Sequence, residues 1–260
     1  MTTPDDGVWV YAVTTEEPFP GGISGIRGVA GEELRTVTGS GFAAVVGTVR
    51  LDVFGEEALR RNLEDLDWLS ETARRHDAVV AAICAGGATV PLRLATVYFD
   101  DDRVRTMLRD NADELGEALE QITDRSEWGV RAYLDRPRTK ARDTADKPGR
   151  PSGTAYLMQR RAKVAAREEA ESAAGRRADE LFAELARWAV AGVRQPPSPP
   201  DLSTRRSLEI LNASFLVDND HYRDFVTAVE HLGERLDDVE VTLTGPWPPY
   251  SFTSVEAGVR

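Results

Sequence analysis

Apolar residues in the first half of the chain follow two spacings, one typical of strands and one typical of helices. Every position from 8 to 13 is apolar, which predicts a strand that is buried on both faces. Strand-like runs at 34–38 and 42–49 are joined by Gly39-Ser40-Gly41, and this arrangement predicts a hairpin. Large apolar residues then recur every three or four positions from 56 to 84, which predicts a long amphipathic helix.

A second helix is predicted at 103–122, followed by a half-buried strand at 128–134. Three aspartates, Asp100 to Asp102, come directly before this helix. A metal site is one interpretation of them. We favour helix capping, because carboxylates at this position accept hydrogen bonds from free backbone N–H groups and suit the positive end of the helix dipole.

The second half opens with a long helical pattern at 154–192, which contains no internal proline. Its first half consists mainly of Ala, Arg and Glu, and its second half carries Leu181, Phe182, Leu185 and Trp188 at the spacing of core residues. The rest of the chain alternates strand, helix and strand, with an apolar run at 208–217 that predicts a central strand. Helices and strands are therefore mixed in both halves of the chain.

Composition suggests where the chain divides. We predict an N-terminal α+β domain at 1–135, a basic, Pro- and Gly-rich linker at 136–151, and a second domain at 152–260 that opens with the long helix. The 32 basic and 44 acidic side chains give a net charge of −12, which disfavours nucleic acid and anionic membranes as partners.

Nothing in the sequence predicts passage into or across a membrane. The longest apolar run, residues 78–85, is much shorter than the roughly 20 residues that span a bilayer. Asp5 and Asp6 stand where an export signal would be basic, and the single cysteine, Cys84, has no internal disulfide partner. We expect a cytoplasmic protein.

The residues that usually carry chemistry are scattered. The three histidines, His76, His221 and His231, form no recognisable motif, and the glycines between 21 and 28 do not have the spacing of a dinucleotide-binding loop. We therefore predict no catalytic, cofactor-binding or metal-binding residues and no enzymatic activity.

The C-terminal run GPWPPYSF, residues 245–252, is more informative. Its prolines stiffen the chain and its aromatic rings supply contact area, a combination typical of a protein-binding segment. The residues predicted to contact a partner here are Trp247, Pro248, Pro249, Tyr250 and Phe252. The alternative is that these rings cover the core of the C-terminal domain.

Several sequence blocks resemble the gas vesicle protein GvpL/GvpF family, and together they span nearly the whole chain. They are VWVYAV (8–13), LEDLDWLSETARRHDAVV (63–80), TVPLRLATVYFDDDRVRTML (89–108), EWGVRAYLD (127–135), SGTAYLMQRRAKVAARE (152–168), LNASFLVD (211–218) and LTGPWPPYSF (243–252). Leu94-Ala95 departs from the pattern, since the resemblance leads us to expect Phe-Gly there.

The resemblance implies a two-domain α+β fold in which the second domain is a modified ferredoxin-like fold. It also implies a non-enzymatic role in building gas vesicles, the hollow protein shells that give cells buoyancy, and the major shell protein GvpA as a partner. A soluble acidic protein with a stiff aromatic segment would shield the apolar face of the shell protein before assembly.

Two further functions remain open at this stage. The Ala-, Arg- and Glu-rich half of the long helix, 157–176, including Arg160 and Arg161, has few large apolar residues and would dock other gas vesicle accessory proteins. A small-molecule enzyme or sensor built on ferredoxin-like domains is the third interpretation, and it requires a pocket with converging polar groups.

Overall fold

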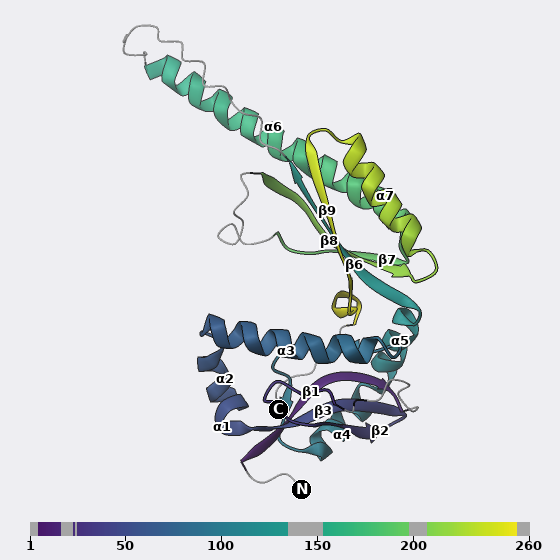
Figure 1. Cartoon of the computed structure of the whole chain (residues 1–260). Helices are drawn as coiled ribbons and strands as arrows, with labels where there is room; N and C mark the ends of the chain where they lie inside the picture. The colour runs from purple at the N-terminus through teal and green to yellow at the C-terminus, as the bar shows by residue number, and fades with distance from the viewer. Residues whose placement is uncertain (1–4, 17–22, 24, 135–152, 198–206, 254–260) are drawn as a thin grey trace. The chain divides into compact units, whose positions relative to one another are not determined.

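The computed structural model describes residues 5–16, 23, 25–134, 153–197 and 207–253 (Figure 1). Two units, each with its own sheet, make up the chain. The first comprises residues 1–127 together with 246–260, and the second comprises residues 128–245. Both units mix helices with strands, so the predicted α+β class with two domains is confirmed.

The sheet of the first unit is built around β1 (Asp6–Thr15), the strand predicted to be buried on both faces. On one side β1 pairs with β3 (Phe42–Arg50), which in turn pairs with β2 (Leu34–Gly39). The short strands β4 (Val90–Pro91) and β5 (Val97–Tyr98) also pair with β1, and all these pairings are antiparallel. Positive φ angles at Ser40 (56°) and Gly41 (83°) give the β2–β3 hairpin a two-residue turn of the type that matches strand twist. The predicted hairpin is confirmed.

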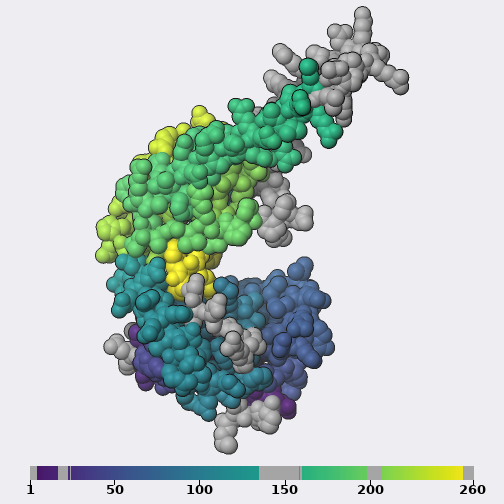
Figure 2. Space-filling model, turned by 180° about the vertical axis from the view of Figure 1, so that it is seen from behind, coloured from purple at the N-terminus to yellow at the C-terminus, as the bar shows by residue number. Residues whose placement is uncertain are grey.

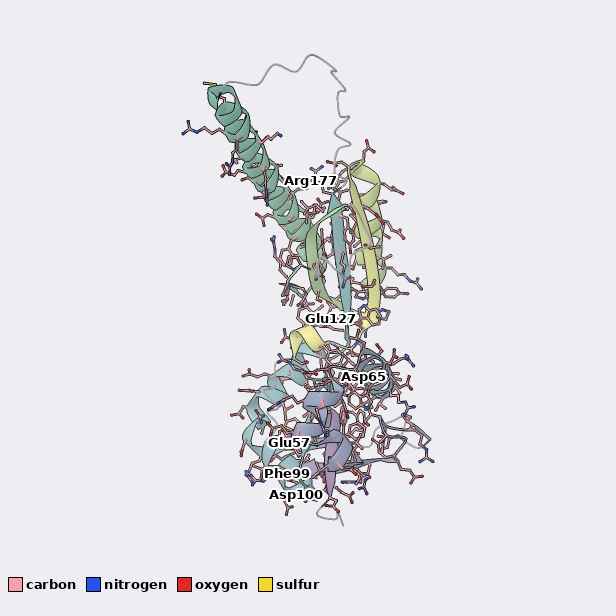
Figure 3. The ribbon with its side chains drawn as sticks, turned by 90° about the vertical axis from the view of Figure 1, so that its left-hand side faces the viewer. Glu57, Asp65, Phe99, Asp100, Glu127 and Arg177 are labelled. Atoms are coloured by element: carbon pink, nitrogen blue, oxygen red, sulfur yellow. The ribbon has the colours of Figure 1, made fainter. Side chains whose placement is uncertain are left out.

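The helix predicted over 56–84 is divided into two, α2 (Glu56–Asn62) and α3 (Leu66–Cys84). A short helix, α1 (Leu51–Phe54), precedes them. The break lies at Asp65, whose side chain accepts hydrogen bonds from the backbone N–H groups of Asp67 and Trp68 and so caps α3 (Figure 3). As a result Leu66, one of the regularly spaced apolar residues of the predicted helix, is 74% exposed.

The next predicted helix also consists of two, α4 (Asp101–Asp110) and α5 (Ala112–Ile122). Asp100 accepts a 2.8 Å hydrogen bond from the backbone N–H of Arg103, so the capping interpretation is confirmed for this residue. The break is at Asn111, whose side-chain amide donates to the carbonyl oxygen of Met107 and ends α4. Helix α3 covers one face of the sheet, and α4 lies on the other (Figure 1).

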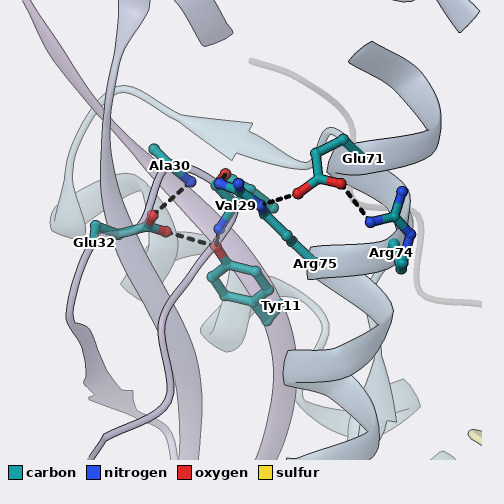
Figure 4. A network of polar contacts seen from close by, with 7 residues as sticks. All are labelled: Tyr11, Val29, Ala30, Glu32, Glu71, Arg74 and Arg75. Carbon is teal, nitrogen blue, oxygen red and sulfur yellow. Dashed lines mark hydrogen bonds and ion pairs between the residues drawn. The ribbon is translucent and has the colours of Figure 1, made fainter. Parts of the chain in front are cut away.

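A polar network joins β1 to the loop before β2 (Figure 4). The buried hydroxyl of Tyr11 donates to Glu32 Oε1 (2.6 Å) and accepts from the backbone N–H of Val29 (2.8 Å). Burial first, and then the neighbouring Glu32 carboxylate, raise the pKa of Tyr11. A Cβ atom at Gly28 or Gly47 would overlap Glu32 Oε1, so this network requires glycine at both positions.

The departure from the family pattern at Ala95 has a backbone consequence. Ala95 has a φ of 67°, in the left-handed region that costs a residue with a Cβ about 1 kcal/mol or more. We expect Ala95→Gly to raise the free energy of unfolding by about 1 kcal/mol, measured by urea denaturation. Ala85→Gly is the matched control, since Ala85 has an ordinary φ of −64° and its replacement should destabilise the protein. A loss of stability in both variants would contradict the argument.

The second unit has the strand and helix order of a ferredoxin-like fold. Its elements are β6 (Arg125–Leu134), α6 (Gly153–Leu185), β7 (Ala191–Arg194), β8 (Leu208–Asp218), α7 (Tyr222–Arg235) and β9 (Val239–Trp247). The sheet order β7-β8-β6-β9 places the first strand of the unit between its third and fourth. Helices α6 and α7 pack on this sheet through a shared core that includes Leu181, Leu185, Phe215, Phe225 and Leu232. The predicted ferredoxin-like second domain, with its long helix, is confirmed.

The boundaries of the units differ from the predicted ranges. Residues 128–134 were assigned to the first domain, but Val130 and Ala132 are buried in the core of the second. Conversely, the chain from Pro246 onward belongs to the first unit, although β9, the last strand of the second, ends at Trp247. The predicted linker at 136–151 lies outside the described residues.

Helix α6 changes character along its 33 residues. Its last three turns are buried through Ala174, Ala178, Leu181 and Leu185. Every residue from 160 to 173 is exposed. Trp188 was predicted to continue the buried stripe, but α6 ends at Leu185, and a short 3-10 helix (Ala186–Trp188) leaves this ring 49% exposed.

Candidate partner-binding surfaces

The C-terminal run places its residues in two different environments. After β9, Tyr250–Phe252 form a 3-10 helix, η3. Phe252 and Pro249 are buried, and Tyr250 packs against the core between the first sheet and α3. The rings of Tyr250 and Phe252 therefore cover apolar core, as the alternative interpretation has it. The core that Tyr250 joins, however, is that of the first unit.

A carboxylate fixes η3 in this position. Glu127, only 6% exposed, accepts hydrogen bonds from the backbone N–H (2.9 Å) and the hydroxyl (2.6 Å) of Ser251 (Figure 3). The hydroxyl of Tyr250 donates to Asp77 on α3 at 3.3 Å. Burial, reinforced by the Asp77 charge, raises the pKa of Tyr250. These contacts lock η3 onto the first unit.

Trp247 is the aromatic ring of the run that remains at the surface. It is 54% exposed, and Pro248 beside it is partly buried. A rigid ring on a proline-stiffened backbone loses little conformational entropy on binding. Trp247 therefore stays our prediction for a partner contact from this run.

The predicted basic pair on the long helix is fully at the surface. Arg160 and Arg161 lie in the first half of α6, where both are exposed. They are therefore accessible to a partner that binds this part of α6.

The structure adds a surface that the sequence did not predict. Trp188, Val190 and Val193 are 49%, 47% and 39% exposed, and they lie on or just before β7. Among the described strands β7 pairs only with β8, so it forms one edge of the second sheet. Exposed apolar side chains beside an open strand edge suit the binding of another polypeptide. We call this set the β7-edge surface.

His76 and Cys84 are held in structural contacts. His76 is 1% exposed, and its Nδ1 accepts a hydrogen bond from the indole N–H of Trp9 (3.1 Å). Its Nε2 lies 3.0 Å from the carbonyl oxygen of Leu92. Burial lowers the pKa of His76 and raises the pKa of the Cys84 thiol to about 11, so the thiol is protonated and unreactive at neutral pH.

Two features of the described residues bear on other classes of function. Within the described ranges no group of three His, Cys, Asp or Glu side chains is arranged to hold a metal ion. No described helix combines the length and the apolar character needed to cross a membrane.

Comparisons with known proteins agree across nearly the whole chain. A sequence model of the family described as gas vesicle synthesis protein GvpL/GvpF matches residues 7–254. Gas vesicle protein L of Streptomyces sp. (strain CB03234) is 39% identical over 250 residues, covering 95% of this chain and 92% of the relative. Gas vesicle protein F of the same strain is 28% identical over 204 residues, covering 73% of this chain and 80% of the relative.

Solved structures show the same fold. The crystal structure of the gas vesicle protein GvpF from Anabaena sp. PCC7120 superposes with a TM-score of 0.65 at 19% identity, covering 96% of this chain and 97% of the other. That of GvpF from Microcystis aeruginosa gives a TM-score of 0.63 at 17% identity, covering 95% and 99%. The family model and the relative from Streptomyces establish that the chain belongs to the gas vesicle GvpL/GvpF family.

Proposed function

We propose that this protein assists the formation of gas vesicles by binding the major shell protein GvpA, and that it does so without catalysing a reaction. Membership of the GvpL/GvpF family supports the gas vesicle role. The observation that carries the binding role is the β7-edge surface, which exposes Trp188 and two valines beside a strand edge that pairs with no further described strand.

The distribution of charge supports the same role. The first unit has 13 Arg and Lys residues against 25 Asp and Glu residues, and the second has 19 of each. The whole net charge of −12 therefore lies on the first unit, while the β7-edge surface lies on the unit without net charge. An apolar shell subunit would bind to the neutral unit, and the acidic unit would keep the complex dispersed by repulsion.

Co-purification from cells that express both proteins tests the proposal. We expect Trp188→Ala combined with Val193→Ala to reduce the recovery of GvpA about tenfold or more, because exposed tryptophans dominate the energy of many interfaces. Trp247→Ala is the second arm, and it tests the C-terminal run separately. Leu66→Ala, at an exposed apolar residue of α3, is the matched control and should leave recovery unchanged.

The outcomes separate the parts of the proposal. Normal recovery of GvpA with both surfaces altered, in proteins with unchanged circular dichroism, would contradict the assigned surfaces. If the unaltered protein fails to recover GvpA, the proposed partner is excluded. Conversion of a metabolite by the purified protein would contradict the non-enzymatic role.

One observation favours a second function. Residues 160–173 of α6 are exposed, Arg160 and Arg161 among them, and none of these described residues belongs to the core of the unit. This segment would serve as a docking site for other gas vesicle accessory proteins. Removing residues 158–173 and recovering all partners would contradict that role.

A further inference from the structure

In the part of α6 at 158–173, Met158 and residues 160–173 are exposed, so the described residues of the unit provide little of the packing that normally supports a helix. This part of α6 continues beyond the sheet and the other helix of its unit (Figures 1 and 2). Met158 is 68% exposed and Val164 is 51% exposed, and the residues from 160 to 173 are exposed throughout. An isolated helix of this length is marginally stable in water, so a second surface that packs on it would stabilise it.

The two sides of this segment differ in chemistry. The sheet-facing side of α6 carries Ala174 and Ala178. Helical spacing places mostly charged residues on this same side in the preceding turns. This explains why the segment does not join the core. On the opposite side Met158, Ala162, Ala165 and Ser172 recur at spacings of three and four, with Glu169 completing the series. We call this series the small-residue stripe after its three short side chains, Ala162, Ala165 and Ser172, which allow two helices to approach closely.

The charges of the segment are divided along its length. Four basic residues come first, and three acidic residues follow: Arg160, Arg161, Lys163 and Arg167, then Glu168, Glu169 and Glu171. Two copies of the segment in parallel would place like charges together. Two copies in antiparallel orientation place the basic part of each beside the acidic part of the other.

The spacing defines a register for this pairing. Arg161 and Glu168 are seven residues apart, two helical turns, so they lie on the same flank of the small-residue stripe. When Ala162 of one copy faces Ala165 of the other, antiparallel geometry brings Arg161 of each copy to Glu168 of its partner. Two-fold symmetry forms this contact twice.

We propose that residues 158–173 of α6 form a self-association surface, on which the same segment of a second copy of this chain packs antiparallel. The occupant is a second copy because the charge pattern is complementary to itself in that orientation. Neither Arg161 nor Glu168 has an oppositely charged residue three or four positions away within the segment, so the pairing competes with no ion pair inside the helix. This inference is independent of binding to GvpA.

Sedimentation velocity of the full chain over a range of micromolar concentrations tests the proposal. We expect a reversible monomer–dimer equilibrium. Arg161→Glu should weaken the dimer about tenfold, because it places carboxylates opposite each other at both symmetric contacts. Glu168→Arg should do the same, and the double variant, which restores opposite charges, should recover the original dimer.

Lys163→Glu is the matched control. It makes the same change of charge, but at a position about a third of a turn or more around the helix axis from the small-residue stripe. It should leave the dimer unchanged, and circular dichroism monitors helix content in every variant. A protein that remains monomeric at all concentrations would overturn the proposal. So would a dimer that none of the variants affects, or single variants whose effects the double variant fails to reverse.

Discussion

Replacing His76 with phenylalanine is expected to lower the free energy of unfolding of the first unit by about 3 kcal/mol. The imidazole joins two buried groups, accepting from the indole N–H of Trp9 at 3.1 Å and bonding to the carbonyl oxygen of Leu92 at 3.0 Å. An indole nitrogen only donates and a carbonyl only accepts, so the ring is neutral with its proton on Nε2. Phenylalanine fills a similar volume but leaves both partners unpaired, and each buried unpaired group costs about 1–3 kcal/mol.

The same residue makes stability depend on pH. Burial lowers the pKa of His76 in the folded protein, against the smaller opposing effects of the bond to Leu92 and the charge of Asp77. Since the unfolded chain has a histidine pKa of about 6.5, the contribution of neutral His76 is complete above that pH. It decreases as the pH falls below about 6.5, because the unfolded chain then takes up a proton that the folded protein excludes.

Urea denaturation at pH 8, 6 and 5 measures both effects. The unaltered protein should lose stability between pH 6.5 and 5, and His76→Phe should be less stable at pH 8 but lose less on acidification. His231→Phe, at an exposed histidine, is the control and should retain the pH dependence of the unaltered protein. If His76→Phe keeps the same dependence on pH, another group is responsible for it.

His76 also illustrates what the sequence predicts and what it leaves open. Its place on the apolar side of a helix is apparent from spacing alone, but its partner Trp9 is 67 residues away. Local features were predicted well because they depend on neighbouring residues. The turn at Ser40-Gly41 and the cap at Asp100 are examples.

Predictions failed where distant segments decide the outcome. Residues 128–134 have the pattern of a half-buried strand, but the sheet that they join is decided by β8 and β9. The aromatic run at 247–252 was recognised, but which rings turn inward depends on Glu127 and Asp77, far away in the sequence. The β7-edge surface was missed because Trp188 continues the spacing of the buried helix, and only the end of α6 at Leu185 exposes it.

The residues that follow Gly245 belong to the first unit, and their removal is expected to have a second large effect on stability. A chain that ends at Gly245 is expected to lose about 5 kcal/mol of stability in its first unit. The Tyr250 ring would leave the core, which costs about 2–3 kcal/mol, and Glu127 would lose two charge-assisted hydrogen bonds worth about 1.5 kcal/mol each. Because domains are stable by only about 5–15 kcal/mol, this loss is enough to populate unfolded forms of the first unit.

Hydrogen exchange measured along β1 and α3 reports this loss directly. These amides should exchange much faster in the chain ending at Gly245, while those of β8 and α7 should keep their protection, because no described residue beyond 245 belongs to the core of the second unit. A chain ending at Thr253 is the matched control, because it keeps Tyr250, Ser251 and Phe252 and should behave like the full protein. Equal protection of β1 and α3 in the two shortened chains would mean that η3 rests on the first unit without stabilising it. In that case the rings of the C-terminal run would be available to a partner after all, as the sequence first suggested.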